Sequence, residues 1–538
     1  MNKLTFDEFL YLGFFVLLSI AKGLGLYEGQ KLFILLVIPA LLCGGLKILL
    51  SPYTKRQWVT LILLLFLTGL VYMQSLELGT FFIMFMVLGM KKVSLQKVLR
   101  IGLWVWSVCA VVLCLISFTR LEHTVYRVSD KLGLGYIFRW SLGFTHPNIL
   151  HITYLTLCAL IIYELADRSG LRHYAILMLG NILVFLYSVS YTGFAIVTVL
   201  LLGGIYVKIR PRFCLLEKML VNLILPLILF ISFALPFMLY DSRFKAPLIK
   251  LNDLVNTRIN IAHFFLVPEC MSLFGAKMSY LAQAQTQGYL SIDNSYIWAF
   301  IHYGIIPFIL LMLAYLILIA DYTKKQKTRE LVLIICFLGA GYTEPLLFNT
   351  SFKNITLLFL GELLFRQKEG EEYCLLPGLR KKLDIILQKT VEKLTKQSLF
   401  QWGLPVLYTK IRKQYRKQIL AAAAVCMLIG IVFCALLYQE PKGYVMPRTN
   451  TDWLERDFYY LESADDPAYE GYRIMNYHDP ETIMQVLEGN AVKLETVRYY
   501  VGSALIGGLF GAVMWISVLL IRKRGVWAVA EISGYDRE

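Results

Sequence analysis

Arg258 is the residue whose type and setting first suggest chemistry. It lies within residues 241–294, the longest polar interruption in the first 365 residues, between two apolar segments. A guanidinium group binds phosphate through a fork of two hydrogen bonds and stays charged at any relevant pH. We therefore predict that Arg258 binds a lipid-linked phosphate or diphosphate. We expect residues 251–263 to form a short surface helix with Arg258 in its middle. Arg243 and Lys245 share the stretch and could instead extend toward lipid headgroups, an alternative that also applies to Arg258.

Two carboxylates could act beside this arginine. Asp293 closes the polar stretch in the run Asp293-Asn294-Ser295-Tyr296, where an apolar segment begins. A carboxylate at the rim of a membrane can accept a proton from a hydroxyl group, and it can also cap the helix that starts beside it. Glu344 lies near the end of a later apolar segment, where an unpaired carboxylate is unfavourable. We expect Glu344 to pair with an external arginine and to position it.

A third set of polar residues begins an earlier apolar segment. His146, Pro147 and Asn148 lie within the predicted span 141–165, and His151 follows one turn later. Pro147 has no N–H group, so we expect a kink and a free carbonyl group. Asn148 and His151 are three residues apart and should point into one cavity. For both histidines the alternative is a satisfied hydrogen bond between helices. Arg139 belongs to a cationic cluster just before this segment.

The elements that must position these residues are membrane-spanning helices. The chain has 538 residues, of which 58% are hydrophobic and 17% charged, with a mean hydropathy of +0.61. This composition is too apolar for a soluble protein and predicts an all-α polytopic membrane protein. Since about 20 apolar residues cross the hydrocarbon layer, we predict about fourteen spans, near 4–22, 31–51, 57–74, 76–90, 99–119, 141–165, 173–189, 191–207, 219–240, 294–320, 329–347, 354–366, 418–438 and 499–521.

The placement of Lys and Arg predicts the orientation of these spans. Basic residues occupy every second connection over five loops. Cytoplasmic loops carry such an excess, so both termini should be cytoplasmic and residues 241–294 should be outside. The net charge of +16 lies in these short clusters, which argues against nucleic-acid binding. The ten cysteines are scattered and form no CxxC pair, so we expect neither a zinc site nor a redox motif.

The chain changes character after residue 366. Residues 367–417 form a basic segment with an amphipathic pattern, which we expect to lie on the cytoplasmic side against anionic lipid. Residues 439–498 hold twelve acidic and six basic residues, and we expect a small helical domain outside the membrane. The predicted organisation is therefore a core of about twelve spans over 1–366 with its external loop 241–293, the basic segment, a span at 418–438, the acidic domain, a span at 499–521 and a cytoplasmic tail at 522–538.

Six short motifs occur in an order that resembles the Wzy-type polysaccharide repeat-unit polymerases, which share a superfamily with the O-antigen ligases. They are Arg139-Trp-Ser-Leu-Gly-Phe-Thr-His146-Pro147-Asn148, Ser190-Tyr-Thr192-Gly193, Leu251-Asn through Arg258-Ile, Leu273-Phe-Gly275, Asp293-Asn294-Ser-Tyr296 through Gly304, and Gly341-Tyr-Thr-Glu344-Pro345 through Asn354. The resemblance covers about residues 1–366. Many relatives have an arginine where Tyr191 stands, and the ligases have a histidine where Asp293 stands.

The resemblance implies a GT-C-like fold in the cytoplasmic (inner) membrane, with an active site on its outer face. The implied substrate is an undecaprenyl-diphosphate-linked oligosaccharide, polymerised into capsular polysaccharide, exopolysaccharide or O-antigen without metal or cofactor. A flippase and a chain-length regulator are the implied protein partners. Catalysis would fall to Arg258, Asp293 and Glu344. Substrate binding would fall to Arg139, His146, Asn148, His151, Arg243, Asn294, Tyr296 and His302, with His302 as a second candidate for activating the acceptor.

Three other functions are compatible with the sequence. A ligase would transfer finished polysaccharide to another acceptor, but Asp293 favours a polymerase. A transporter or flippase would carry polar residues near the middle of the bilayer in two related halves. Here the unusual charges gather at the predicted outer face, and no internal repeat is visible. A non-catalytic assembly component is the third alternative, and it fits residues 367–538 best.

Overall fold

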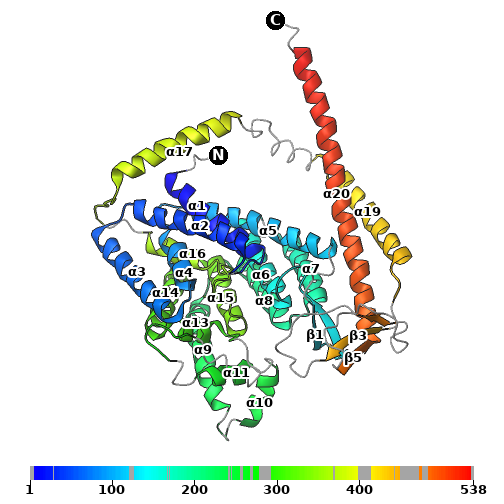
Figure 1. The fold of residues 1–538 in the computed structure, drawn as a ribbon, viewed down its shortest axis with the longest axis horizontal. Helices are drawn as coiled ribbons and strands as arrows, with labels where there is room; N and C mark the ends of the chain where they lie inside the picture. Colours follow the sequence, from blue (N-terminus) through cyan, green and yellow to red (C-terminus); the bar gives the residue numbers. More distant parts are fainter. Residues whose placement is uncertain are drawn as a thin grey trace. The chain divides into compact units, whose positions relative to one another are not determined.

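The structure is a computed structural model, and it describes residues 5–27, 29–119, 126–165, 168, 170–239, 241, 243, 245–254, 258–266, 271–277, 292–366, 370–397, 414–440, 443–448, 472–474 and 483–534. The described chain is almost entirely helical (Figure 1). It divides into two compact units. The first comprises residues 1–126 and 140–381, and the second comprises residues 127–139 and 382–538. The predicted all-α class is confirmed for the membrane-spanning part of the protein.

The first unit contains most of the helices. They are α1 (Phe6–Gly23), α2 (Lys31–Leu50), α3 (Lys55–Ser75), α4 (Gly79–Leu88), α5 (Leu95–Thr119), α6 (Pro147–Leu165), α7 (Leu171–Ser188), α8 (Tyr191–Ile209), α9 (Leu215–Met238), α10 (Lys245–Leu254), α11 (Arg258–Phe265), α13 (Ser295–Tyr303), α14 (Ile305–Lys324), α15 (Thr328–Thr343) and α16 (Leu357–Leu364). A continuous apolar core joins all of these helices except α10 and α11, with Phe14, Tyr315 and Phe337 fully buried.

Ten described helices are long and apolar enough to cross a membrane, and eight of these belong to the first unit. The remaining predicted spans correspond to α1, α4, α15 and α16. Helix α1 includes Asp7, Glu8 and Lys22 among its 18 residues, while α4, α15 and α16 have 10, 16 and 8 residues. The protein is thus a multi-pass membrane protein by its helices. The total of fourteen spans stays a prediction.

The predicted span 294–320 is two helices, because the chain breaks at Gly304. Gly304 has φ +85°, a conformation that favours glycine. A Cβ atom built on it would lie 2.2 Å from the backbone nitrogen of Gly275, which has φ +94°. The backbone of residues 272–276 covers the break: Ile305 N–H donates to the Ser272 carbonyl at 2.9 Å, and Ala276 N–H donates to the Ile301 carbonyl at 3.1 Å. Two of the sequence motifs therefore meet here.

The polar stretch 241–294 carries two short helices in its described part. Figure 1 shows α10 and α11 beyond the end of α9, and both contact that helix. The sequence predicted one surface helix over residues 251–263 with Arg258 in its middle. Instead, Arg258 is the first residue of α11. A cation at a helix N-terminus is unfavourable to the helix dipole, so this position calls for nearby negative charge.

The basic segment after α16 first returns to the helices of the core. Tyr373 forms an antiparallel bridge with Tyr53, whose N–H donates to the Tyr373 carbonyl at 3.0 Å. Arg380 then pairs with Asp7 of α1, and Lys47 of α2 lies 2.7 Å from the same carboxylate. Arg380 belongs to α17 (Pro377–Gln397), so part of this amphipathic segment is a helix. Its contact with lipid stays a prediction.

The second unit corrects the prediction of a small helical domain at 439–498. Its described residues include β3 (Gly443–Arg448), β4 (Tyr472–Ile474) and β5 (Ile483–Glu488), in the order β4-β3-β5. Strand β3 runs parallel to β4 and antiparallel to β5. Short runs that contain Tyr, Val and Ile favour strands, and the acidic composition of the domain concealed that local preference.

Two long helices and the greater part of a hairpin also belong to the second unit. The helices are α19 (Arg416–Leu437) and α20 (Asn490–Gly534), which is longer than the predicted span 499–521. Strands β1 (Tyr126–Asp130) and β2 (Tyr136–Trp140) form the hairpin. Buried Arg498 of α20 pairs with Glu495 and donates to the Phe138 carbonyl at 2.8 Å. The hairpin is thereby attached to α20.

Candidate active site

Asn294, rather than Asp293, caps helix α13. The side-chain oxygen of Asn294 accepts the Tyr296 N–H at 2.8 Å and the Ile297 N–H at 3.2 Å. Its amide nitrogen donates to Ser232 Oγ of α9 at 3.0 Å. An asparagine is among the best N-cap residues, and it satisfies two backbone donors here. Capping, the alternative that the sequence left open for Asp293, is thus carried out by its neighbour.

Packing between α11 and α13 brings Arg258 to the Asp293 carboxylate. Ala262 and Phe265 of α11 form a buried apolar cluster with Ile297 and Ile301 of α13. Arg258, at the start of α11, therefore lies beside the start of α13. Its Nε atom is 3.3 Å from Asp293 Oδ2. The arginine at a helix N-terminus thus has the negative neighbour that its position calls for.

Glu344 supplies the second carboxylate. It follows the last residue of α15, and its Oε1 atom lies 3.4 Å from Arg258 Nη2 and accepts a hydrogen bond from Asn148 Nδ2 at 2.7 Å. Ser295 Oγ donates to the Glu344 carbonyl at 2.6 Å and accepts the Leu347 N–H at 3.2 Å. The backbone from the Glu344 carbonyl to Leu347 is therefore fixed. The pairing predicted for Glu344 is present, and its partner is Arg258.

We call Arg258, Asp293, Glu344 and Asn148 the Arg258 cluster. The side chains of Arg258 and Glu344 are 9% and 11% exposed, whereas that of Asp293 is 33% exposed. The contacts of 3.3 and 3.4 Å are longer than the 2.7–2.9 Å or so that is usual for charge-assisted hydrogen bonds. A guanidinium group has five N–H donors and can bind an anionic oxygen in addition to carboxylates, and the accessible Asp293 can accept a proton.

The comparisons with known proteins add no relative. No family model, curated protein or solved structure matches this chain. In the described part of the chain, no group of three or more His, Cys, Asp or Glu side chains is placed to hold a metal ion. The chemistry of the site must therefore be argued from the cluster itself.

His151 does not share a cavity with Asn148. Its ring nitrogens lie 3.0 Å from Ser188 Oγ and 2.8 Å from Asn181 Oδ1, both on α7, and the residue is fully buried. A Cβ atom at Gly193 would lie 2.6 Å from the His151 ring, so α8 packs directly against it. The prediction of a shared cavity is wrong because Asn148 faces α15 while His151 faces α7 and α8. His151 holds helices together.

His146 and Pro147 begin α6 rather than interrupt it. The His146 carbonyl accepts the Leu150 N–H at 3.2 Å, and its Nδ1 atom accepts the Asn148 N–H at 2.9 Å. Pro147 is the first residue of the helix, where its missing N–H has no intrahelical acceptor to lose. The predicted kink is therefore absent. The turn instead points Asn148 toward Glu344.

The four remaining predicted substrate-binding residues have surroundings of their own. Tyr296 is fully buried and donates to the Leu338 carbonyl at 2.7 Å. His302 stacks on Trp298, with ring centroids 4.4 Å apart, and lies 3.4 Å from Glu77. Arg243 is 79% exposed and pairs with Asp241 at 2.8 Å. Arg139 is buried on β2 in the second unit. Roles in substrate binding for all four stay predictions.

Sequence reasoning missed two serines that support the site. Ser295 fixes the backbone around Glu344, and Ser232 holds the cap of α13. Ser295 lies inside a motif that the sequence had already singled out, so its type and place were a usable signal. Ser232 lies in the middle of an apolar helix. A hydroxyl group at such a position usually bonds within the bundle, which is a weaker signal.

Proposed function

We propose that the chain is an integral-membrane glycosyltransferase that polymerises undecaprenyl-diphosphate-linked oligosaccharide repeat units at the outer face of the cytoplasmic membrane. The main support for the proposal is the position of Arg258. Arg258, from the polar stretch, lies between the carboxylates of Asp293 and Glu344, which belong to two other sequence motifs. A cation held between two carboxylates at the ends of apolar helices suits a substrate with a charged head and a lipid tail.

The reaction assigns one task to each member of the cluster. A hydroxyl oxygen of the incoming unit attacks the anomeric carbon of the growing chain, and the bond from that carbon to the diphosphate oxygen breaks. The electron pair leaves with the diphosphate, whose charge Arg258 stabilises. The proton of the attacking hydroxyl passes to Asp293, the more exposed carboxylate. Glu344 and Asn148 hold Arg258 in place.

The contacts of Arg258 with Asp293 and Glu344 also suit a site that must release its diphosphate product. A guanidinium group has five N–H donors, and its two carboxylate contacts are long. A diphosphate can therefore bind without complete loss of either carboxylate. The two carboxylates also prevent the arginine from holding the diphosphate product too tightly. Such a site favours release of the diphosphate product after each reaction over its tight retention.

Deletion of the gene followed by extraction of lipid-linked intermediates tests the function. We expect single repeat units to accumulate on the outer face of the membrane and polymer to be absent. Units retained on the cytoplasmic face would refute the polymerase and favour a flippase. Polymer that forms normally but is not joined to its acceptor would favour a ligase.

A pair of arginine variants tests the site. Arg258→Ala should reduce polymer below detection at an unchanged protein level, because it removes the group that stabilises the leaving diphosphate. Arg100→Ala is the matched control, since Arg100 is half exposed and, among the described residues, pairs with a single carboxylate, that of Glu164, at 2.8 Å. We expect normal polymer from that control. Normal polymer from Arg258→Ala would remove the role assigned to Arg258.

A further inference from the structure

Lys353 is a buried cation that the proposed reaction does not use. It lies between α15 and α16, is 6% exposed, and its ammonium group is 5.4 Å from the centroid of the Trp106 ring of α5. The residue before it, Phe352, has φ +59°, which is rare for a bulky side chain. The Phe352 ring packs on Phe14 and Phe15 of α1. The residue after it, Asn354, donates to the Leu347 carbonyl at 2.9 Å. The orientation of Lys353 is therefore fixed from both sides.

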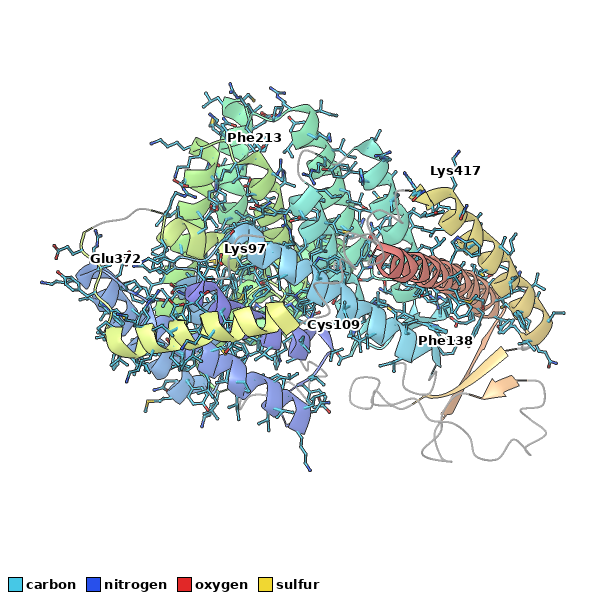
Figure 2. The ribbon with its side chains drawn as sticks, turned by 90° about the horizontal axis from the view of Figure 1, so that it is seen from above. Lys97, Cys109, Phe138, Phe213, Glu372 and Lys417 are labelled. Carbon is cyan, nitrogen blue, oxygen red and sulfur yellow. The ribbon has the colours of Figure 1, made fainter. Side chains whose placement is uncertain are left out.

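Two more buried donors come from the helices that pack around this lysine. Trp106 Nε1 and Ser19 Oγ are buried, and neither has a hydrogen-bond partner among the residues that the structure describes. Ser19 lies on α1 one turn after Phe15 and one turn before Gly23. A Cβ atom at Gly23 would lie 3.7 Å from the Trp106 ring and 2.9 Å from Cβ of Cys109, which Figure 2 labels on α5. Ser19 is thus on the face of α1 that meets α5.

Comparison with two other buried lysines shows what Lys353 lacks. Lys47 lies 2.7 Å from Asp7, and Lys91, whose ammonium group is 4.5 Å from the Tyr53 ring centroid, lies 3.2 Å from Glu372. Within the described residues, Lys353 has an aromatic ring but no carboxylate. A ring face compensates a buried ammonium group less than an anion does. Among the described residues, the environment of Lys353 therefore supplies no negative charge.

We propose that Lys353, Trp106 and Ser19 form a second anion-binding site, which takes a phosphate group. An ammonium group is a good point-charge ligand for phosphate, and the indole N–H and the hydroxyl group add two donors. The inference rests on the proposed function, in which two lipid-linked units must be held at once. Each unit carries its own diphosphate, and the Arg258 cluster stabilises only the one that leaves. The Lys353 site holds a phosphate of the other.

Binding of diphosphate to the purified full-length protein in nanodiscs tests the site. We expect two sites per chain for inorganic diphosphate or for farnesyl diphosphate by isothermal titration calorimetry. Lys353→Met should remove one site, or weaken it at least about tenfold, because a hydrogen-bonded charge is lost. Trp106→Phe keeps the ring face and removes only the N–H group, so we expect a loss of about two- to tenfold. Methionine suits a buried apolar site, so the variant should fold.

Two controls separate this inference from the proposed function. Lys91→Met removes a buried ammonium group that has its own carboxylate, and both sites should persist in that variant. Arg258→Ala should remove the other site only. A loss with Lys353→Met that is seen for farnesyl diphosphate alone supports a lipid-linked source, and a loss for both probes supports a general phosphate site. Two undiminished sites in Lys353→Met, or one site that only Arg258→Ala removes, would overturn the Lys353 site and leave the proposed function standing.

Discussion

Neutral substitutions in the Arg258 cluster, made singly and in pairs, measure how strongly Arg258 is coupled to each carboxylate. Arg258 and Glu344 are replaced by glutamine, and Asp293 is replaced by asparagine. Arg258 lies 3.3 Å from Asp293 and 3.4 Å from Glu344, so distance alone predicts equal coupling. The different exposure of the two carboxylates predicts unequal coupling. The side chain of Glu344 is 11% exposed, and that of Asp293 is 33% exposed. We therefore expect Arg258 to be coupled more strongly to Glu344.

The magnitudes follow from the two environments. Two unit charges 3.4 Å apart attract each other by about 5 kcal/mol at an effective dielectric constant of about 20, and loss of hydration offsets part of this. A net coupling energy of about 1–3 kcal/mol between Arg258 and Glu344 remains. For Asp293, water screens the pair, and we expect a coupling energy below about 1 kcal/mol.

Double-mutant cycles in the free energy of unfolding provide the measurement. The variants Arg258→Gln, Glu344→Gln and Asp293→Asn would be unfolded by denaturant in mixed micelles, with tryptophan fluorescence as the signal. A neutral glutamine at 344 can still accept the Asn148 hydrogen bond, so the cycle isolates the charge. A stronger coupling of Arg258 to Asp293 than to Glu344 would contradict the assignment of Glu344 as the positioning carboxylate.

Substitutions at three further positions test structural roles, the first two by thermal unfolding at matched protein level and the third by the amount of folded protein that accumulates. Asn294→Ala should lower the free energy of unfolding by about 1–2 kcal/mol because α13 loses its cap and the bond to Ser232. Asn294→Asp should recover much of that loss. Equal stability of the two variants would exclude the cap. His151→Phe should destabilise the protein by about 1–3 kcal/mol because the bonds to Ser188 and Asn181 are lost. Polymer formation should stay intact in the molecules that fold. A stable but inactive variant would show that His151 acts in the active site. Gly304→Ala should prevent accumulation of folded protein, because its Cβ atom would lie 2.2 Å from the Gly275 nitrogen, and normal expression would show that the backbone can move apart.

The sequence alone identified the segments of the site but not their contacts. Arg258, Asp293 and Glu344 were singled out because charged residues are unusual at the ends of apolar segments, and the structure brings all three together. Asn148 was expected to share a cavity with His151 and instead contacts Glu344. A spacing of three places two side chains on one side of a helix, but it does not say which neighbouring helix each one meets.

Local rules could not identify the cap residue of α13 either. Asp293 and Asn294 are both favourable N-cap residues, and the sequence cannot choose between neighbours that differ by one position. The structure decides for Asn294 because its amide nitrogen also reaches Ser232 of α9. That choice leaves Asp293 beside Arg258. The strands at 443–448 and 483–488 were missed for a related reason, since domain composition was read in place of local pattern.

The sequence by itself determined that this is a multi-pass helical membrane protein and that its unusual charges gather in a few motifs. Hydropathy and charge can be read from short stretches of sequence, so they predict spans and charged motifs without knowledge of packing. Only the tertiary structure decided that Arg258, and not Arg243, meets the two carboxylates. That choice depends on α11 packing against α13 and on a hydrogen bond between residues 196 positions apart, Asn148 and Glu344. Contacts over such separations arise from the packing of several helices at once, and no local pattern encodes them.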